Sequence, residues 1–265
     1  MPASSPDLPV IRTLGGCGGT LVSRLFGALP RTVVLSETNP RSVHLFGGTL
    51  NPLRQLRQWR PELLEEVADF DDAEIGYPPA FGRMLQGLAA TIARQDHRLI
   101  VRDFNYADFI GVPFIWPPPG DFSLDAALAD RFTPRAIYLV RHPVDQLASL
   151  RTHRSLERVL SAEQFVAGAQ AFLDARGGAP LFRYEDLTEA PETTFHAMCE
   201  ALGVAHAPEA LIRFTDVKTV TGSLVRAADT TITRGAPLPG ADRARQELSK
   251  TPGYTRLIAA LGYAA

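Results

Sequence analysis

Short apolar runs alternate along the chain with longer stretches in which apolar residues recur every three or four positions. This alternation is typical of β–α units that surround a mostly parallel sheet. Parallel strands are buried on both faces, so their sequences stay continuously apolar. We therefore predict an α/β fold of three α/β/α layers around a central, mostly parallel five-stranded sheet, with strands at residues 8–14, 32–36, 98–102, 136–141 and 180–184.

Amphipathic stretches follow most of these runs and predict helices at residues 20–29, 143–154, 162–175 and 192–202. A proline opens the second of them, and Gly203 is a typical residue just beyond a helix end. Residues 40–95 lack strand character, which predicts a helical substrate-binding insertion with loops, whereas residues 112–122 predict a rigid, proline-rich aromatic loop. A chain of 265 residues is expected to form one domain, 1–265, that contains this insertion.

The charge balance argues against one broad class of function. The 27 basic and 29 acidic residues give a net charge of −2, whereas proteins that bind nucleic acid through bulk charge carry a basic excess. Lys218 and Lys250 are the only lysines, so 27 − 2 = 25 of the basic residues are arginine. We therefore expect a bound anion to be held by guanidinium groups or backbone amides.

The remaining composition predicts a cytoplasmic protein with no membrane span. Two cysteines, Cys17 and Cys199, make neither a disulfide framework nor a metal-ligand cluster. The first ten residues lack the basic and apolar regions of a signal peptide. No apolar run approaches the roughly 20 residues of a membrane helix.

Candidate functional residues follow the predicted strands. Ligands of an open parallel sheet bind beyond the carboxyl ends of its strands. There the sequence has a glycine-rich turn at 15–20, then Glu37, Arg102, Arg141 and Tyr184, one group after each strand. One edge would thus bring together two arginines, a carboxylate and an aromatic ring, which is typical of a phosphorylated-nucleotide site with one general base.

Four glycines in the five positions 15–19 indicate an anion-binding turn. Glycine permits positive φ and lets backbone N–H groups converge on an anion at the start of the next helix. Close packing between strand and helix would account for one or two of them. A Walker A loop would need a lysine before Thr20, and the strand that ends at Arg141 offers no magnesium-binding aspartate. Both departures disfavour a metal-dependent NTPase or kinase.

Four ordered segments make the chain resemble the sulfotransferases that use 3′-phosphoadenosine-5′-phosphosulfate (PAPS), a family with a P-loop NTPase-like fold. Arg141 at a strand end, with Ser149 eight residues later, resembles the family's 3′-phosphate motif, and residues 182–187 (FRYEDL) resemble its Tyr-Glu-Asp segment. Residues 15–20 and 218–235 are similar in position to its 5′-phosphosulfate loop and its nucleotide-covering loop.

The resemblance implies metal-independent, in-line transfer of a sulfuryl group from PAPS to a hydroxyl, with PAP as product. It also implies the nucleotide-binding residues: Gly15, Gly16, Cys17, Gly18, Gly19 and Thr20 at the 5′-phosphosulfate, Arg141 and Ser149 at the 3′-phosphate, Tyr184 at the adenine, and Arg226 and Arg234 closing over the 3′-phosphate. Taken singly, Arg141 could be a surface ion pair, Ser149 a solvated helix residue and Tyr184 a core tyrosine.

Glu37 is the candidate general base. In the bacterial, carbohydrate and tyrosylprotein branches of the family, a glutamate at a similar place has this role. Glu37 could instead cap the following segment or pair with an arginine such as Arg41. His44 is the competing base, although it lies seven residues beyond the strand end.

The acceptor is expected between residues 40–95 and the aromatic loop. Asp103, Phe104, Asn105 and Trp116 are the candidate substrate-binding residues. Asp103 and Asn105 could instead terminate the third strand, and the aromatic rings could belong to the core. The acceptor is expected to be a small-molecule or saccharide hydroxyl, with no nucleic-acid partner, and a homodimer is compatible with the sequence.

One departure from the family concerns charge. Relatives usually carry Lys or Arg in the 5′-phosphosulfate loop, where this chain has Cys17. Backbone amides could suffice, Arg12, Arg24 or Arg102 could reach in, or activity could be lost, which would leave a nucleotide-binding protein. A nucleophilic Cys17 and an ATP-dependent phosphotransferase are further alternatives.

Overall fold

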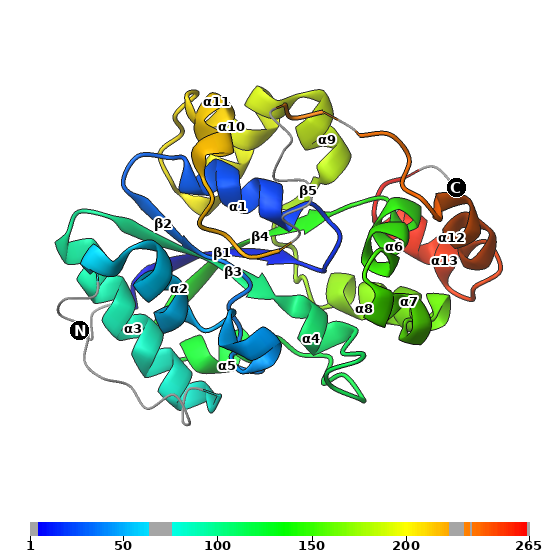
Figure 1. Ribbon diagram of the computed structural model, residues 1–265, viewed down its shortest axis with the longest axis horizontal. Helices are drawn as coiled ribbons and strands as arrows, with labels where there is room; N and C mark the ends of the chain where they lie inside the picture. Colours follow the sequence, from blue (N-terminus) through cyan, green and yellow to red (C-terminus); the bar gives the residue numbers. More distant parts are fainter. Residues whose placement is uncertain (1–4, 64–75, 223–230, 234, 264–265) are drawn as a thin grey trace.

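Five parallel strands form one sheet in the order β2-β3-β1-β4-β5 (Figure 1). The strands are β1 (Asp7–Thr13), β2 (Thr32–Leu35), β3 (Arg98–Phe104), β4 (Thr133–Val140) and β5 (Leu181–Arg183). This computed structural model describes residues 5–63, 76–222, 231–233 and 235–263. The five predicted strands are confirmed, whereas their spatial order was not predicted.

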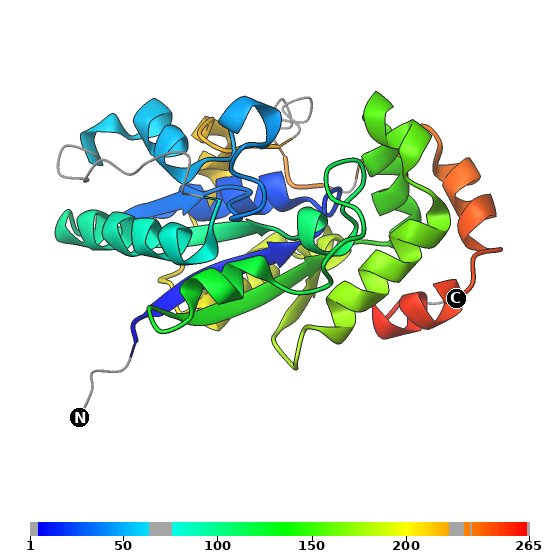
Figure 2. The same cartoon turned by 90° about the horizontal axis from the view of Figure 1, so that it is seen from below.

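Helices cover both faces of the sheet, which confirms the α/β/α layers (Figures 1 and 2). One face carries α1 (Gly19–Gly27), α10 (Pro191–Leu202) and α11 (Ala210–Arg213), followed by the short η3 (Phe214–Asp216). The other carries α2 (Pro52–Trp59), α3 (Pro78–Arg94) and α5 (Ser123–Leu128). Each face has its own apolar core.

The alternation of side chains along β1 and β3 separates these two cores. Leu8 and Val10 pack with α2, α3 and α5, whereas Ile11 faces α1. Successive strand residues point to opposite faces. On β3, Val101 is in the α3 core and Ile100 in the α1 core, so Arg102 points toward α1 and Asp103 away from it.

The remaining helices gather beyond the carboxyl ends of the strands and beside β5, at the right of Figure 1. They are α4 (Asn105–Phe109), α6 (Pro143–Arg151), α7 (Arg154–Val159), α8 (Ala162–Asp174), α9 (Tyr184–Glu189), α12 (Ala241–Leu248) and α13 (Tyr254–Ala260). Of these, α6 and α9 contribute residues that contact the glycine turn.

Several boundaries differ from the prediction. The expected helix 143–154 is divided into α6 and α7, and the expected strand 180–184 ends one residue early because Tyr184 begins α9. Gly203 does end α10, with a left-handed φ of 63°. The described part of residues 40–95 holds α2, α3 and the short η1 (Leu45–Gly48) and η2 (Pro61–Leu63) but no strand. Among the described residues, no helix has both the length and the apolar character needed to cross a membrane.

Candidate active site

The glycine turn between β1 and α1 is closely surrounded by other elements. Gly16 and Gly18 have φ values of 81° and 88°, in the left-handed region that favours glycine. A Cβ on Gly15 would lie 2.9 Å from Leu150, one on Gly16 2.9 Å from a carbonyl of α6, and one on Gly18 would overlap the ring of Tyr184. Close packing and backbone conformation therefore require glycine at these positions, and the same geometry is compatible with the predicted anion-binding turn.

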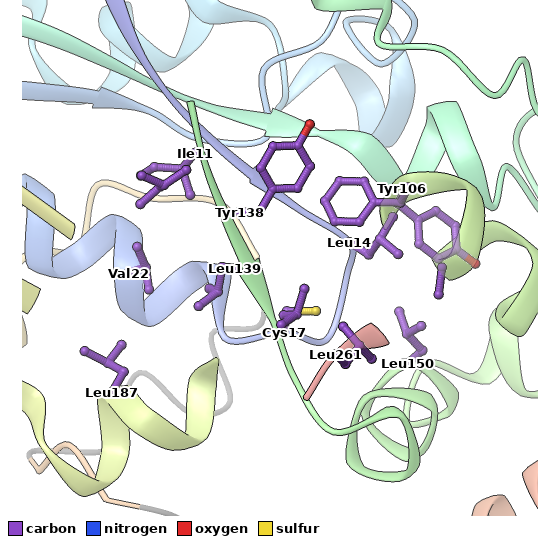
Figure 3. Packing of buried hydrophobic residues seen from close by; sticks show 14 of the residues in the cluster. Ile11, Leu14, Cys17, Val22, Tyr106, Tyr138, Leu139, Leu150, Leu187 and Leu261 are labelled. Atoms are coloured by element: carbon purple, nitrogen blue, oxygen red, sulfur yellow. The ribbon is translucent and has the colours of Figure 1, made fainter. Parts of the chain in front are cut away.

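Cys17 lies in the middle of this turn and faces the protein core. It is 2% exposed, and Figure 3 shows it in the same apolar cluster as Leu14, Leu139 and Leu261. Burial raises the pKa of its thiol to about 12, so the thiolate that a nucleophile needs does not form near neutral pH. The burial of Cys17 disfavours the alternative of a Cys17 nucleophile.

Among Arg12, Arg24 and Arg102, the three arginines considered as a substitute for the loop cation, Arg102 is the one that reaches the glycine turn. A Cβ on Gly19 would lie 2.6 Å from its Nη1. Its Nε and Nη2 donate to Ser36 Oγ at 3.2 and 2.7 Å, and Nη2 also donates to the Thr221 carbonyl at 3.1 Å. Nη1 donates to none of the described residues. Arg102 is 4% exposed, and burial lowers its pKa while Glu37 opposes that effect.

The other two arginines considered for this place have different partners. Arg12 points to the opposite face of the sheet, where its guanidinium contacts Asp103 and Asp125 and lies 3.7 Å from the centre of the Phe122 ring. Arg24 donates to the carbonyl oxygens of Phe214 and Thr215 at 3.0 and 3.2 Å. Of the three, Arg102 alone lies at the glycine turn.

Glu37 follows β2 and faces Arg102. Its Oε1 lies 3.5 Å from Nη2 of Arg102, and its side chain is 17% exposed. Its φ of 57° is in the left-handed region, a strained conformation for a residue with a Cβ. Glu37 therefore does pair with an arginine, as the alternative to a general base predicted, but the partner is Arg102 rather than Arg41. Arg41 instead pairs with Asp108 and Asp121, each at 2.9 Å.

His44 lies apart from this ion pair. It is exposed at the start of η1, and its Nε2 would be 3.4 Å from a Cβ on Gly76. Glu37, and not His44, therefore lies beside Arg102, the arginine of β3 that adjoins the glycine turn.

Arg141 lies on the other side of the turn, against Tyr184. Its Nη1 donates to the Gly16 carbonyl at 3.3 Å, and its guanidinium lies 4.7 Å from the centre of the Tyr184 ring. Its Nε has no hydrogen-bond partner among the described residues. Tyr184 is only 8% exposed, which favours a packing role over direct contact with an adenine.

Helix α6 also approaches the turn. Gln146 donates to the Gly15 carbonyl at 3.0 Å. Ser149 is half-buried one turn further along α6, on the same side of the helix as Gln146 because residues three apart are neighbours on a helix surface. Ser149 therefore belongs to the helix that flanks the turn, although the structure shows no contact between its hydroxyl and Arg141.

The residue after Tyr184 joins distant parts of the chain. Glu185 accepts from the backbone N–H of His142 at 3.1 Å and from the hydroxyl of Tyr263 at 2.5 Å. The rings of His142 and Tyr263 meet edge to face at 5.0 Å. The sequence showed the Tyr-Glu-Asp segment but contained no signal that would pair it with Tyr263, 78 residues later.

The segment that was expected to cover the nucleotide begins over the start of α1. The Thr20 hydroxyl lies 3.4 Å from the Thr221 carbonyl, and a Cβ on Gly222 would overlap that hydroxyl. Arg226 and Arg234, the candidates for closing over a 3′-phosphate, lie outside the described residues.

Asp103 and Asn105 lie beneath the surface at the end of β3. They are 1% and 0% exposed, and Asn105 donates to Asp103 at 2.6 Å and accepts from the Thr13 N–H at 3.1 Å. This burial favours the alternative that they organise the strand end rather than contact an acceptor. Burial, together with the nearby Asp108, raises the pKa of Asp103 to about 7.

Aromatic rings beyond β3 form a partly exposed surface. Phe46 is 56% exposed and lies edge to face with Phe114 at 5.1 Å and with Phe104 at 6.4 Å. Phe104 and Phe114 are half-buried, and Trp116 is 64% exposed. Phe46 was not singled out in the sequence, where nothing distinguishes it from a core phenylalanine.

No three His, Cys, Asp or Glu side chains are grouped to hold a metal ion in the part of the chain that the structure describes.

Two solved structures share this architecture along their whole length. The sulfotransferase domain of the olefin synthase from Synechococcus PCC 7002 superposes with a TM-score of 0.63 at 20% identity, covering 100% of this chain and 98% of that one. The sulfotransferase domain from the curacin biosynthetic pathway gives a TM-score of 0.60 at 15% identity, covering 98% and 99%. No protein-family model and no curated protein sequence matches this chain. The chain therefore has the fold of these sulfotransferase domains.

Proposed function

We propose that this protein transfers a sulfuryl group from PAPS to a hydroxyl of an organic acceptor. The observation that carries the proposal is the position of Arg102, whose buried guanidinium adjoins both Gly19 of the anion-binding turn and the carboxylate of Glu37. A cation at this place would stabilise the charge that develops on the transferred group and on the departing phosphate, next to the group that would accept a proton. The shared fold of two sulfotransferase domains supports it.

The donor fits the residues at the turn. Nη1 of Arg102 has no hydrogen-bond partner among the described residues and can donate to an anion at the turn, whereas the unpartnered Nε of Arg141 is buried. We assign Arg102 and the amides of residues 15–20 to the 5′-phosphosulfate, and Arg141 with Ser149 to the 3′-phosphate. Tyr184 would hold Arg141 in place through its ring.

The proposed reaction is an in-line displacement at sulfur. The acceptor oxygen forms a bond to sulfur, and the bond between sulfur and the bridging oxygen of the 5′-phosphate breaks. Its electron pair leaves on PAP, and Glu37 takes the acceptor's proton. As in phosphoryl transfer, most of the catalysis would come from positioning and from stabilisation of charge, without a metal ion.

The acceptor would approach over the aromatic surface formed by Phe46, Phe104 and Phe114, with the exposed Trp116 as a further candidate contact. Phe104 lies two residues beyond Arg102 in the sequence, which connects this surface with the strand that bears the proposed cation. A small-molecule or saccharide hydroxyl fits such a surface. A cytoplasmic location and a homodimer remain predictions for localisation and sedimentation experiments.

Calorimetry with PAP, followed by transfer from radiolabelled PAPS across a panel of alcohols, phenols and saccharides, tests the proposal. We expect PAP to bind and label to appear in at least one acceptor, and ATP with magnesium to give no turnover. ATP turnover without PAP binding would instead indicate a phosphotransferase. PAP binding without transfer to any acceptor would indicate a nucleotide-binding protein that lacks catalysis.

A further inference from the structure

A set of polar side chains is completely enclosed behind Glu37, and the proposed reaction does not use it. We call Asn39, Asp103, Asn105, Asp108 and Ser123 the buried polar cluster; none of the five is more than 3% exposed. They come from the turn after β2, the end of β3, α4 and α5. The cluster thus joins four parts of the chain directly beneath the proposed base.

Asn39 is the centre of this cluster. Its amide nitrogen donates to Asp103 at 2.9 Å and to Asp108 at 2.8 Å. Its amide oxygen accepts from the Arg41 N–H and from the Ser123 hydroxyl, each at 2.9 Å. The Ser123 hydroxyl also lies 2.8 Å from Oδ1 of Asp108, and a hydroxyl has a single proton to donate. The Asn39 side chain thus has four polar contacts, one of which it shares with Asp108.

Such a cluster is a costly way to hold a protein together. Burial raises the pKa of both Asp103 and Asp108, and well-packed apolar residues often stabilise a core as well as buried charged groups do. Buried polar networks do, however, fix one arrangement of the chain when every member is paired. The cluster therefore suits a part of the molecule whose geometry matters more than its stability.

The turn above the cluster has such a geometry. Glu37 has a left-handed φ of 57°, a strained conformation for a residue with a Cβ that persists only where its surroundings enforce it. The Thr38 N–H donates to the Arg102 carbonyl at 2.8 Å, and the Ser42 hydroxyl donates to the Asn39 carbonyl at 3.0 Å. These bonds, with the four of Asn39, fix the backbone on the carboxyl side of Glu37.

We propose that Asn39 is a positioning residue for Glu37. By bridging Asp103 and Asp108, its side chain holds the turn in the conformation that keeps the Glu37 carboxylate beside Arg102 and the glycine turn. Asn39 does not touch substrate, and its effect is transmitted through the backbone of residues 37–39. This inference rests on the proposed function, because it assigns Asn39 to the base of that reaction.

The test uses Asn39→Ala in the full-length chain, with Leu88→Ala as a matched control. Leu88 is fully buried on α3, in the apolar core that α3 shares with α2 and α5, and it is not a member of the buried polar cluster. We expect Asn39→Ala to lower kcat by about tenfold or more, because small displacements of a reacting group have large effects, with unchanged affinity for PAP in calorimetry. Leu88→Ala should lower the Tm by a similar amount without lowering kcat at a temperature where it stays folded.

Two further measurements separate positioning from general destabilisation. In a crystal structure of Asn39→Ala with PAP, Glu37 should leave its left-handed conformation and its place beside Arg102. In the Glu37→Gln background, assayed with radiolabelled PAPS, Asn39→Ala should change the residual rate by less than about twofold, because two residues that act as a unit are not additive. Ser123→Ala, which removes one bond to Asn39, serves as the milder variant if Asn39→Ala does not fold.

Several results would overturn the inference. These are an unchanged kcat, a parallel loss of PAP affinity, an equal loss of rate in both backgrounds, or an undisturbed Glu37 in the crystal structure. Failure of the proposed function itself would look different, since the wild-type chain would then neither bind PAP nor transfer label from PAPS.

Discussion

The two sides of the candidate site are built in different ways. The proposed donor side consists of the half-buried glycine turn and of Arg102, Arg141 and Tyr184, which are nearly buried and fixed by contacts from different strands and helices. The acceptor side consists of aromatic rings that keep much of their surface exposed, most clearly Phe46 at 56%. The donor side can therefore select by charge and fixed geometry, whereas the acceptor side selects by the shape of an apolar surface. The predictions below test this division.

The largest effect is expected from Glu37→Gln, at the boundary between the two sides. Turnover should fall by about 10²–10⁴-fold, because the proton acceptor is lost. PAP should bind at least as tightly as before, since a negative charge near Arg102 has been removed. Steady-state kinetics and PAP calorimetry measure the two quantities. Retained turnover would exclude Glu37 as the base.

The next largest effect is expected from Arg141→Ala, which should lower the affinity for PAP, a property of the proposed donor side. A hydrogen bond to a charged group contributes about 1.5–3 kcal/mol, so PAP affinity should fall by about tenfold or more. Arg57→Ala, at an exposed position of α2 far along the chain from the glycine turn, is the matched control. If both variants bind PAP equally well, Arg141 does not hold the nucleotide.

Phe46→Ala should affect the acceptor side alone. An edge-to-face aromatic contact contributes about 0.5–1.5 kcal/mol beyond its buried area, so the KM for an acceptor that uses the surface should rise a few-fold. The affinity for PAP should stay unchanged, and the Tm should change little because the ring is more than half exposed. A change in PAP affinity with an unchanged acceptor KM would contradict the division into two sides.

Cys17→Ala should have the smallest effect. Its thiol is buried in the apolar core and remains protonated near neutral pH, so turnover should stay within about twofold of the wild type. Iodoacetamide should label Cys17 in the native protein far more slowly than in the unfolded one. Complete loss of turnover in Cys17→Ala would show that the thiol takes part in the reaction.

The fold was largely predictable because each strand is a short, continuous run of apolar residues that can be recognised from its own sequence. Continuous runs such as LIV at 99–101 indicate a strand without knowledge of its neighbours, and Gly203 marks the end of α10 by its own conformational freedom. The end of β5 was misplaced because Tyr184, an aromatic residue that suits a strand, begins a helix. The sheet order depends on long-range contacts and could not be obtained in this way.

The candidate site was predictable only as a set of positions. The carboxyl ends of parallel strands meet at one edge, which brought Glu37, Arg102 and Arg141 together in the prediction. Which arginine reaches the turn depends on the face to which each side chain points. The strand alternation that places Arg102 toward α1 and Arg12 away from it was present in the sequence and is the signal that could have decided the question. Nothing in the sequence indicated that the hydroxyl of Tyr263 would donate a hydrogen bond to Glu185.

In the proposed site the cation is Arg102, which lies on β3 and not in the glycine turn. This position has a consequence for substitutions at residue 17. A lysine at position 17 would bring its ammonium group into the apolar cluster that now holds the Cys17 thiol, where an unpaired charge is strongly disfavoured. A basic residue at position 17 would therefore require the surrounding core to change with it. Under the proposed function, Arg102 on β3 supplies the charge instead, and a search for a basic residue within the loop would overlook a chain built in this way.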